Sequence, residues 1–207
     1  MRVLPVGEHA LLVECADAEE TAACHAELLR RRAVRELPPV AEIVPAARTV
    51  LLDGVADPPA LARELAGWRL HGTVEGDRRT VEVPVVYDGP DLEVVAAHWG
   101  VAPEEVGQRH AGFDYRVAFC GFAPGFAYLS GLDPAWAVPR RETPRTSVPA
   151  GSVGVAGEYT GVYPRSSPGG WRLVGRTDAP LWDLDRDPPA LLTPGVRVRF
   201  VPRGGAR

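Results

Sequence analysis

The stretch VPAGSVGVAGEYTGVYPRSSPGGW, residues 148–171, holds six glycines and three prolines in 24 positions. Its apolar residues come in short runs, each cut by glycine or proline. Similar runs follow one another from Tyr115 onward: YRVAFCGF, FAYLSGL, SVGVAG, GVYP, WRLVGR and VRVRFV. Short strands at this spacing are typical of a closed β-barrel, which leaves no sheet edge open. We therefore predict a barrel here, with VRVRFV as its last strand and its arginines facing outward.

The glycines of this stretch need an explanation beyond turns. Glycine weakens a strand, so a dense series marks bulges or a close approach of the backbone to a ligand. Arginines that suit carboxylate or phosphate groups surround the stretch, as do aromatic side chains that could wall a pocket. They are Arg140, Arg141, Arg145, Arg165, Arg172 and Arg176, with Tyr128, Tyr159, Tyr163 and Trp171. The alternative is a glycine-rich barrel with arginines on its surface.

The N-terminal part has a different sequence pattern, which predicts both strands and helices. The patterns predict two strands within residues 2–14, a helix from Asp17 to about Arg35, strands at about 40–44 and 48–53, a helix from Asp57 to Ala66, and a strand near 80–86. Glu20, three residues after Asp17, completes a capping box. This order resembles a small α+β sandwich of ferredoxin-like character.

The polar, glycine-bearing stretch Leu70–Arg79 is the predicted hinge between two domains. We expect residues 1–78 to form an N-terminal α+β domain and residues 79–207 to form the barrel domain. Two short helices are predicted before the barrel strands, at 91–100 and 102–110. The fold class is therefore α+β.

Charge is distributed unevenly along the 207 residues. Residues 1–136 carry 12 Arg and 21 acids, a net charge of −9, whereas residues 137–207 carry 11 Arg and 6 acids, a net charge of +5. The basic part suits a small anionic substrate or an acidic partner, and the alternative is a solvated face. The sequence contains no lysine, which excludes a Schiff-base lysine, a P-loop lysine or a lysine general base.

Other features exclude several classes of protein. No apolar run approaches the ~20 residues of a membrane helix, and the N-terminus lacks the apolar stretch of a signal peptide, so we expect a cytoplasmic protein with neither membrane nor nucleic acid as partner. The widely spaced Cys15, Cys24 and Cys120 indicate reduced thiols, and the five histidines have no metal-ligand spacing. Ser152 is not favoured as a nucleophile, because Ala150 stands where a nucleophile elbow needs glycine.

Four ordered motifs carry a resemblance to a known family. They are FAPGFAYLSGL from Phe122, PRRETPR from Pro139, VPAGSVGVAG from Val148 and YPRSSPGGWRLVGRT from Tyr163. They resemble the family (carboxyltransferase domain, subdomains C and D) that contains the B subunit of bacterial ATP-dependent 5-oxoprolinase, the KipI inhibitor of a sporulation histidine kinase, and allophanate hydrolase subunit 1. The resemblance is close over residues 105–177. It implies a small α/β N-terminal domain and a cyclophilin-like β-barrel.

The resemblance also implies a site on one face of the barrel. The implied catalytic residues are His110, as a proton shuttle near neutral pH, and Arg116. For His110 the alternative is a structural histidine at a helix end. The implied substrate-binding residues are Phe122, Pro124, Gly125, Phe126, Arg140, Arg145, Gly151, Ser152, Tyr159, Tyr163, Ser167, Gly169, Gly170 and Trp171. The chain departs from the family at Tyr159, where oxoprolinase-like members commonly have glutamine.

The activity that the resemblance implies is the ATP-dependent opening of 5-oxo-L-proline to L-glutamate. The implied partners are a carboxyltransferase-like C-subunit homologue and a LamB/YcsF-like A-subunit homologue, and the chain alone should be inactive. ATP is the expected cofactor, with Mg at the assembled complex, and no tightly bound cofactor or metal ligand is expected in this chain. The alternatives are a KipI-like inhibitor that binds a sensor histidine kinase, and a carboxyltransferase-like component of a urea or allophanate pathway.

Overall fold

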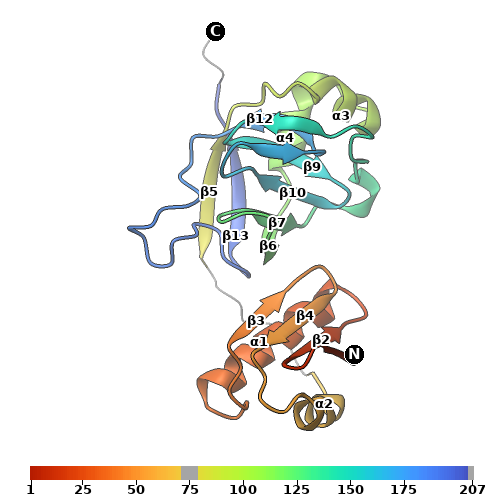
Figure 1. Ribbon diagram of the computed structural model, residues 1–207. Helices are drawn as coiled ribbons and strands as arrows, with labels where there is room; N and C mark the ends of the chain where they lie inside the picture. Colours follow the sequence, from red (N-terminus) through yellow and green to blue (C-terminus); the bar gives the residue numbers. More distant parts are fainter. Residues whose placement is uncertain (71–78, 205–207) are drawn as a thin grey trace. The chain divides into compact units, whose positions relative to one another are not determined.

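The computed structural model describes residues 1–70 and 79–204 and divides into two compact units, Met1–Gly76 and Asp77–Arg207 (Figure 1). The predicted hinge, Leu70–Arg79, lies outside the described residues except at its two ends. The predicted domain boundary between residues 78 and 79 therefore stays a prediction. Each unit is described by itself below.

The first unit is one antiparallel sheet with two helices. The strands are β1 (Arg2–Val6), β2 (Ala10–Glu14), β3 (Glu42–Pro45) and β4 (Thr49–Asp53), in the order β1-β2-β4-β3, and the helices are α1 (Ala18–Ala33) and α2 (Pro58–Ala66). All six elements lie where the sequence predicts them. The strand predicted near 80–86 is β5 (Thr80–Val85), which belongs to the sheet of the second unit.

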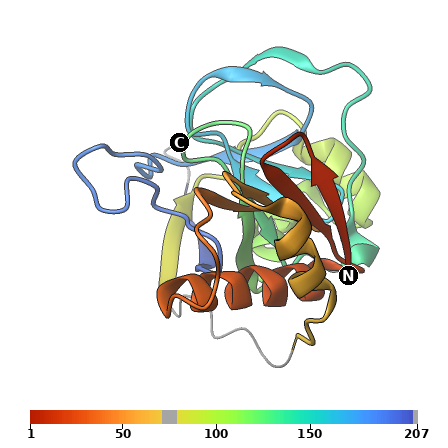
Figure 2. The ribbon, with the colours of Figure 1, turned by 60° about the horizontal axis from the view of Figure 1, so that its bottom comes forward.

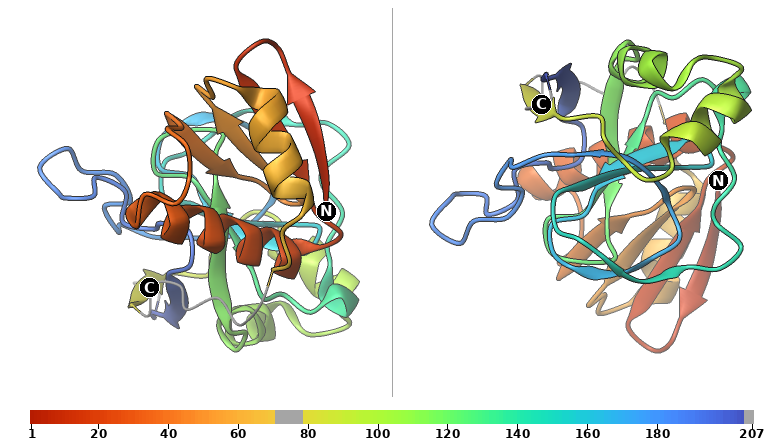
Figure 3. Two further views of the ribbon diagram at one scale, coloured as in Figure 1. Left: turned by 90° about the horizontal axis from the view of Figure 1, so that it is seen from below. Right: turned by 90° about the horizontal axis from the view of Figure 1, so that it is seen from above.

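Capping and burial explain the two helices. Asp17 accepts a hydrogen bond from the amide of Glu20 at 2.8 Å, and Asp57 accepts one from the amide of Ala60 at 3.0 Å. Helix α1 contacts β3 and β4, and α2 contacts β1 and β2. The buried residues of both helices share a single apolar core with the sheet, so the helices cover the same face of it (Figure 3). The unit is a two-layer α+β sandwich.

The second unit is built on a seven-stranded sheet. Its order is β12-β9-β10-β7-β6-β13-β5, and its remaining strands are β6 (Tyr115–Cys120), β7 (Ala127–Ser130), β9 (Ser152–Ala156), β10 (Tyr159–Val162), β12 (Arg172–Arg176) and β13 (Arg197–Pro202). Two hydrogen bonds of 2.9 Å between Val86, just after β5, and Arg176 join the two ends of the sheet. The sheet is thereby closed into a barrel, and the predicted fold class is confirmed.

The alternation in β13 also agrees with the prediction, since Arg197 and Arg199 are exposed while Val198 and Phe200 are buried. Strands β8 (Arg145–Val148) and β11 (Ser167–Gly169) form a separate antiparallel pair that the sequence did not predict. Helices α3 (Leu92–Trp99) and α4 (Val106–Ala111) contact one another as well as β12 and β13, so they lie together beside the barrel (Figure 3). Short 3-10 turns cover Pro103–Glu105 and Pro134–Trp136.

A long loop, residues 177–196, joins β12 to β13 and extends away from the barrel (Figure 2). It exposes Trp182 and Leu184. In the described part of the chain, no helix is long and apolar enough to cross a membrane. The three cysteines are free, and burial raises the pKa of Cys120 to about 11, which keeps this thiol protonated at neutral pH.

Candidate functional site

Besides its main apolar core, the barrel unit has a smaller apolar cluster that consists mainly of aromatic rings. Phe126 lies at its centre, with ring centroids 5.0 Å from Tyr128 and 5.4 Å from both Tyr163 and Trp171, all in edge-to-face contact. This is a favourable geometry for aromatic pairs, because the positive edge of one ring meets the negative face of the next. We call this group the aromatic cluster.

Two glycines of the opening stretch make room for this cluster. Gly154 on β9 lies directly opposite Gly161 on β10. A Cβ atom on Gly154 would lie 3.1 Å from Trp171 Cβ, and one on Gly161 would lie 3.2 Å from Trp171 Cζ3 and 2.8 Å from the carbonyl oxygen of Ala127. These positions are therefore glycine because an indole ring lies over the strands.

A pocket of about 370 Å³ opens on the aromatic cluster, and we call it the aromatic pocket. Its walls come from the loop before β7, from β9 and β10, and from the segments around Pro139 and Gly169. Seven predicted substrate-binding residues line it: Phe122, Phe126, Arg140, Tyr159, Tyr163, Gly169 and Trp171. Five further residues complete the lining: Tyr128, Pro139, Ala156, Gly157 and Pro168.

Phe122 at the rim of this pocket adopts an unusual backbone conformation. Its φ angle is +67°, a region that bulky residues rarely occupy, and its side chain is 59% exposed. Its ring faces Phe126 and Tyr163 edge-on at 5.4 and 6.3 Å. Strained residues of this kind concentrate at ligand-binding sites.

Arg140 is the one charged residue among the described residues that line the aromatic pocket. It is exposed, and no carboxylate lies within 4.0 Å of its guanidinium group in the described parts of the chain. Its five donors in a planar fork are therefore available to a carboxylate or phosphate group of a ligand.

Arg145, by contrast, is already engaged by a buried carboxylate. Asp91, just before α3, is 2% exposed and lies 2.9 Å from the Arg145 guanidinium and 3.3 Å from that of Arg141. It also accepts a hydrogen bond of 2.7 Å from the amide of Leu173. Arg145 in turn donates to the carbonyl of Trp171 at 3.4 Å. Through these contacts Arg145 joins Asp91 to Trp171 in the pocket wall.

The electrostatics of Asp91 agree with this arrangement. Burial by itself would raise the pKa of this carboxyl, but hydrogen bonds from Arg145 and from the Leu173 amide outweigh it and hold the pKa below its ordinary value. Asp91 is therefore ionised and binds together two segments that are distant in sequence, 141–145 and 171–173.

The structure leaves seven predicted substrate-binding residues outside the lining of the aromatic pocket: Pro124, Gly125, Arg145, Gly151, Ser152, Ser167 and Gly170. Gly151 has a φ angle of +79°, and a Cβ atom there would clash with the carbonyl oxygen of Thr177, so it is a turn residue. Ser152 is buried in β9.

His110 lies in the core of the barrel unit and is fully buried. Its ring nitrogens lie 2.8 Å from the hydroxyl of Tyr87 and 2.8 Å from that of Thr160. Burial lowers the pKa of His110 to about 3, so it stays neutral at physiological pH. The expected proton shuttle does not fit this environment, because the imidazole reaches neither solvent nor the aromatic pocket. The structural alternative fits it.

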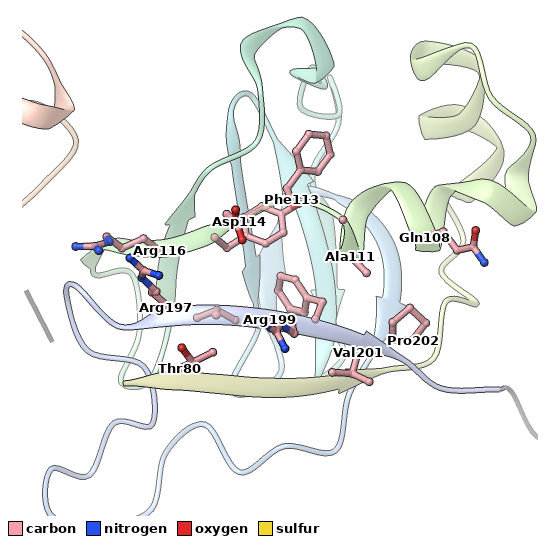
Figure 4. Close-up of a pocket in the computed structure, with 14 residues that line it drawn as sticks. Thr80, Gln108, Ala111, Phe113, Asp114, Arg116, Arg197, Arg199, Val201 and Pro202 are labelled. Carbon is pink, nitrogen blue, oxygen red and sulfur yellow. The ribbon is translucent and has the colours of Figure 1, made fainter. Parts of the chain in front are cut away.

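Arg116, the other predicted catalytic residue, lines a different opening of about 700 Å³ on the outer face of β13 (Figure 4). We call it the β13 groove. None of its lining residues belongs to the aromatic pocket. The fold therefore brings part of the predicted site residues together in the aromatic pocket, whereas His110 is structural and Arg116 lies in the β13 groove.

No histidine, cysteine, aspartate or glutamate is among the described residues that line the aromatic pocket. The ionisable groups there are Arg140 and three tyrosines, and burial raises the pKa values of Tyr159 and Tyr163 further. Within residues 1–70 and 79–204, no group of three or more His, Cys, Asp or Glu is placed to hold a metal ion. The pocket is suited to binding a flat, anionic molecule.

Sequence reasoning missed Asp91 and the smaller lining residues. Asp91 precedes an apolar helical run, and this position predicts a helix cap without indicating arginine partners about 50 positions later. Pro139 and Gly157 lie within the quoted motifs, so their place in the pocket lining could have been predicted from the sequence.

Comparison with known proteins bears on these observations. Residues 1–192 match the family described as carboxyltransferase domain, subdomain C and D. The chain is 44% identical over 176 residues to the B subunit of 5-oxoprolinase from Escherichia coli O157:H7, a match that covers 81% of this chain and 80% of that protein. It is 51% identical over 130 residues to the B subunit of 5-oxoprolinase from Bacillus subtilis (strain 168), covering 61% of this chain and 54% of that one.

Solved structures support the same fold. The crystal structure of TTHA0988 superposes with a TM-score of 0.77 at 38% identity, over 95% of this chain and 40% of that chain. The urea amidolyase of K. lactis superposes with a TM-score of 0.78 at 20% identity, over 97% of this chain and 15% of that chain, and shows likeness of fold. In both proteins, the matched region is less than half of a longer chain.

Proposed function

Because the chain belongs to the family of carboxyltransferase domains, subdomains C and D, we propose that it is the B subunit of an ATP-dependent 5-oxoprolinase. In this role it takes part in opening 5-oxo-L-proline to L-glutamate, and the aromatic pocket binds the substrate. The observation that carries the proposal is the pairing of aromatic walls with one guanidinium group, Arg140, that has no acidic partner in the described residues.

The chemistry of 5-oxoproline suits these walls. The molecule is a small, flat lactam ring that carries one carboxylate. A flat ring packs well on aromatic faces, and a carboxylate accepts two parallel hydrogen bonds from an arginine fork. The hydroxyl of Tyr159 lies in the wall where the family resemblance predicts an amide, so it offers a single group that donates and accepts.

We propose that this chain binds and orients the substrate and that companion proteins of the complex supply acid–base chemistry. The support is that no histidine, cysteine or carboxylate is among the described residues that line the aromatic pocket. In this proposal the ATP that the reaction needs, with its Mg, binds in the assembled complex. The relatives are named as B subunits, which supports a multi-subunit assembly, and we propose homologues of the C and A subunits as its other members.

The two alternative functions have weaker support. No described contact favours a KipI-like inhibitor of a histidine kinase. A role in a urea or allophanate pathway rests on a shorter likeness, 44% identity to a urea amidolyase over 64 residues or 28% of this chain, so it has less support than the 5-oxoprolinase role.

The test is to co-express the chain with homologues of the C and A subunits and to measure ATP-dependent release of glutamate. Arg140→Gln removes the proposed carboxylate contact and should raise KM for 5-oxoproline by about tenfold to a hundredfold. Arg165→Gln is the matched control, because Arg165 is exposed and outside the pocket lining. An unchanged KM in Arg140→Gln would reject the pocket, and subunits that elute separately at micromolar concentration would reject the assembly.

A further inference from the structure

The β13 groove contains an arrangement that the proposed function does not use. Strand β13 pairs with β6 through only two residues, and Arg197 lies directly opposite Arg116. Directly opposed residues on one face of an antiparallel pair have Cβ atoms about 5 Å apart. Figure 4 shows both arginine side chains at the same end of the groove. Like charges so placed repel each other and destabilise the strand pair.

Among the described residues, no acidic side chain forms an ion pair with Arg116 or Arg197. Arg116 and Arg197 have no carboxylate within 4.0 Å among the described residues. Arg199, two positions along β13, is different, because it lies 3.5 Å from Glu82 on β5. Asp114 is an exposed carboxylate in the lining, but no arginine of the described chain lies within 4.0 Å of it. Both guanidinium groups of the pair are therefore available to bind an anion.

The number of donors decides which anion fits. One arginine fork satisfies both oxygens of a carboxylate, which leaves the second guanidinium without a partner. A phosphate monoester has three terminal oxygens and a charge near −2, so it can accept from two forks at once and neutralise both. We propose that the arginine pair, Arg116 and Arg197, binds the phosphate group of a small organic phosphate.

The rest of the groove has room for the organic part of this ligand. The volume of about 700 Å³ far exceeds that of a phosphate ion. Phe113 and Gln108 line the groove further along, where Figure 4 places them away from the arginine pair. An aromatic ring and an amide in the same lining suit a planar, hydrogen-bonding group. This site is separate from the aromatic pocket and does not depend on the proposed substrate.

Isothermal titration of the 207-residue chain at fixed ionic strength tests the proposal, with inorganic phosphate and adenosine monophosphate as probes. Adenosine monophosphate should bind at least tenfold more tightly than phosphate, because only the ester reaches Phe113. Arg116→Gln and Arg197→Gln should each weaken binding of both probes by about tenfold or more. Arg176→Gln is the matched control, since Arg176 is exposed in the same unit and is paired with Asp88 at 2.9 Å.

The outcomes are distinct. Binding that persists undiminished in the double variant Arg116→Gln/Arg197→Gln, or no binding of either probe at millimolar concentration, would overturn the site. Equal affinities for phosphate and its ester would overturn the assignment of the organic part to the groove. The variants leave the aromatic pocket intact, so 5-oxoproline affinity, measured in parallel, separates failure of this site from failure of the proposed function.

Discussion

Gly169, the last residue of β11, lines the aromatic pocket, and Gly170 follows it directly, so the two make a pair for mutation. Neither has a positive φ angle, so alanine suits the backbone at both positions. A Cβ atom on Gly169 would clash with Tyr163 Oη and would lie 2.9 Å from two atoms of its ring. At Gly170 the nearest atoms, on Arg140 and Arg141, lie 3.7 Å away, which is ordinary contact.

The clash at Gly169 cannot be relieved cheaply. Tyr163 is 2% exposed, and its ring packs edge-on against Phe126 and Trp171, so it cannot turn without moving both. Overpacking of a well-packed core costs about 1–3 kcal/mol. Gly170→Ala should instead stabilise the protein by about 0.4–1 kcal/mol, because alanine restricts the unfolded chain without straining the native one.

Urea unfolding followed by tryptophan fluorescence measures the difference. A gap of about 2 kcal/mol between the variants, at an m-value of about 2 kcal/mol/M, separates the unfolding midpoints by about 1 M. Because Tyr163 lines the pocket, Gly169→Ala should also raise KM for 5-oxoproline in the assembled enzyme, and Gly170→Ala should not. Equal midpoints for the two variants would refute the reasoning, since they differ only in what the added methyl group meets.

Three further experiments test other features of the protein. Asp91→Asn should destabilise the protein by about 3 kcal/mol in urea unfolding, because it removes the buried negative charge that the half-buried Arg141 and Arg145 bind. Asp88→Asn, which breaks an exposed pair, should change stability by less than about 1 kcal/mol. His110 has a folded-state pKa of about 3, below its ordinary value of 6.5. The neutral imidazole therefore adds its full contribution to the free energy of unfolding above pH 6.5. This contribution is lost as the pH falls toward 3, by at most about 1.4 kcal/mol per pH unit. The free energy of unfolding between pH 5 and 7 should therefore depend less on pH in His110→Gln than in the parent, and parallel curves would contradict this. Limited proteolysis should cut within the predicted hinge, Leu70–Arg79, and survival of that segment while other exposed loops are cut would count against the boundary.

The elements were predictable where local signals are strong. Asp17 and Asp57 mark the helix starts because their carboxylates cap the first turn, and this information lies within four residues. The barrel strands were predictable because apolar runs end at glycine or proline. Strand β11 was not, because Ser167–Gly169 contains proline and glycine and has no strand propensity of its own.

The candidate site was predictable in composition but not in detail. Sequence cannot show which of several arginines is neutralised, and here Asp91 engages Arg145 from 54 positions away and leaves Arg140 open. Nor can it show that a histidine near a helix end points inward. Tyr87 and Thr160 make hydrogen bonds to the buried His110, and the fold brings these three residues together from three distant parts of the sequence.

The pairing of β5 with β13 has a consequence for how the barrel unit forms. These are its first and last strands, they run parallel, and Thr80 lies beside Arg197. Contacts between such distant positions require a large loop to close before they stabilise anything, which slows folding. During synthesis the ribosome must release residues up to Pro202 before β13 can insert between β5 and β6. Until then β5 and β6 present unpaired edges, and we expect the nascent barrel to aggregate more readily than the complete one.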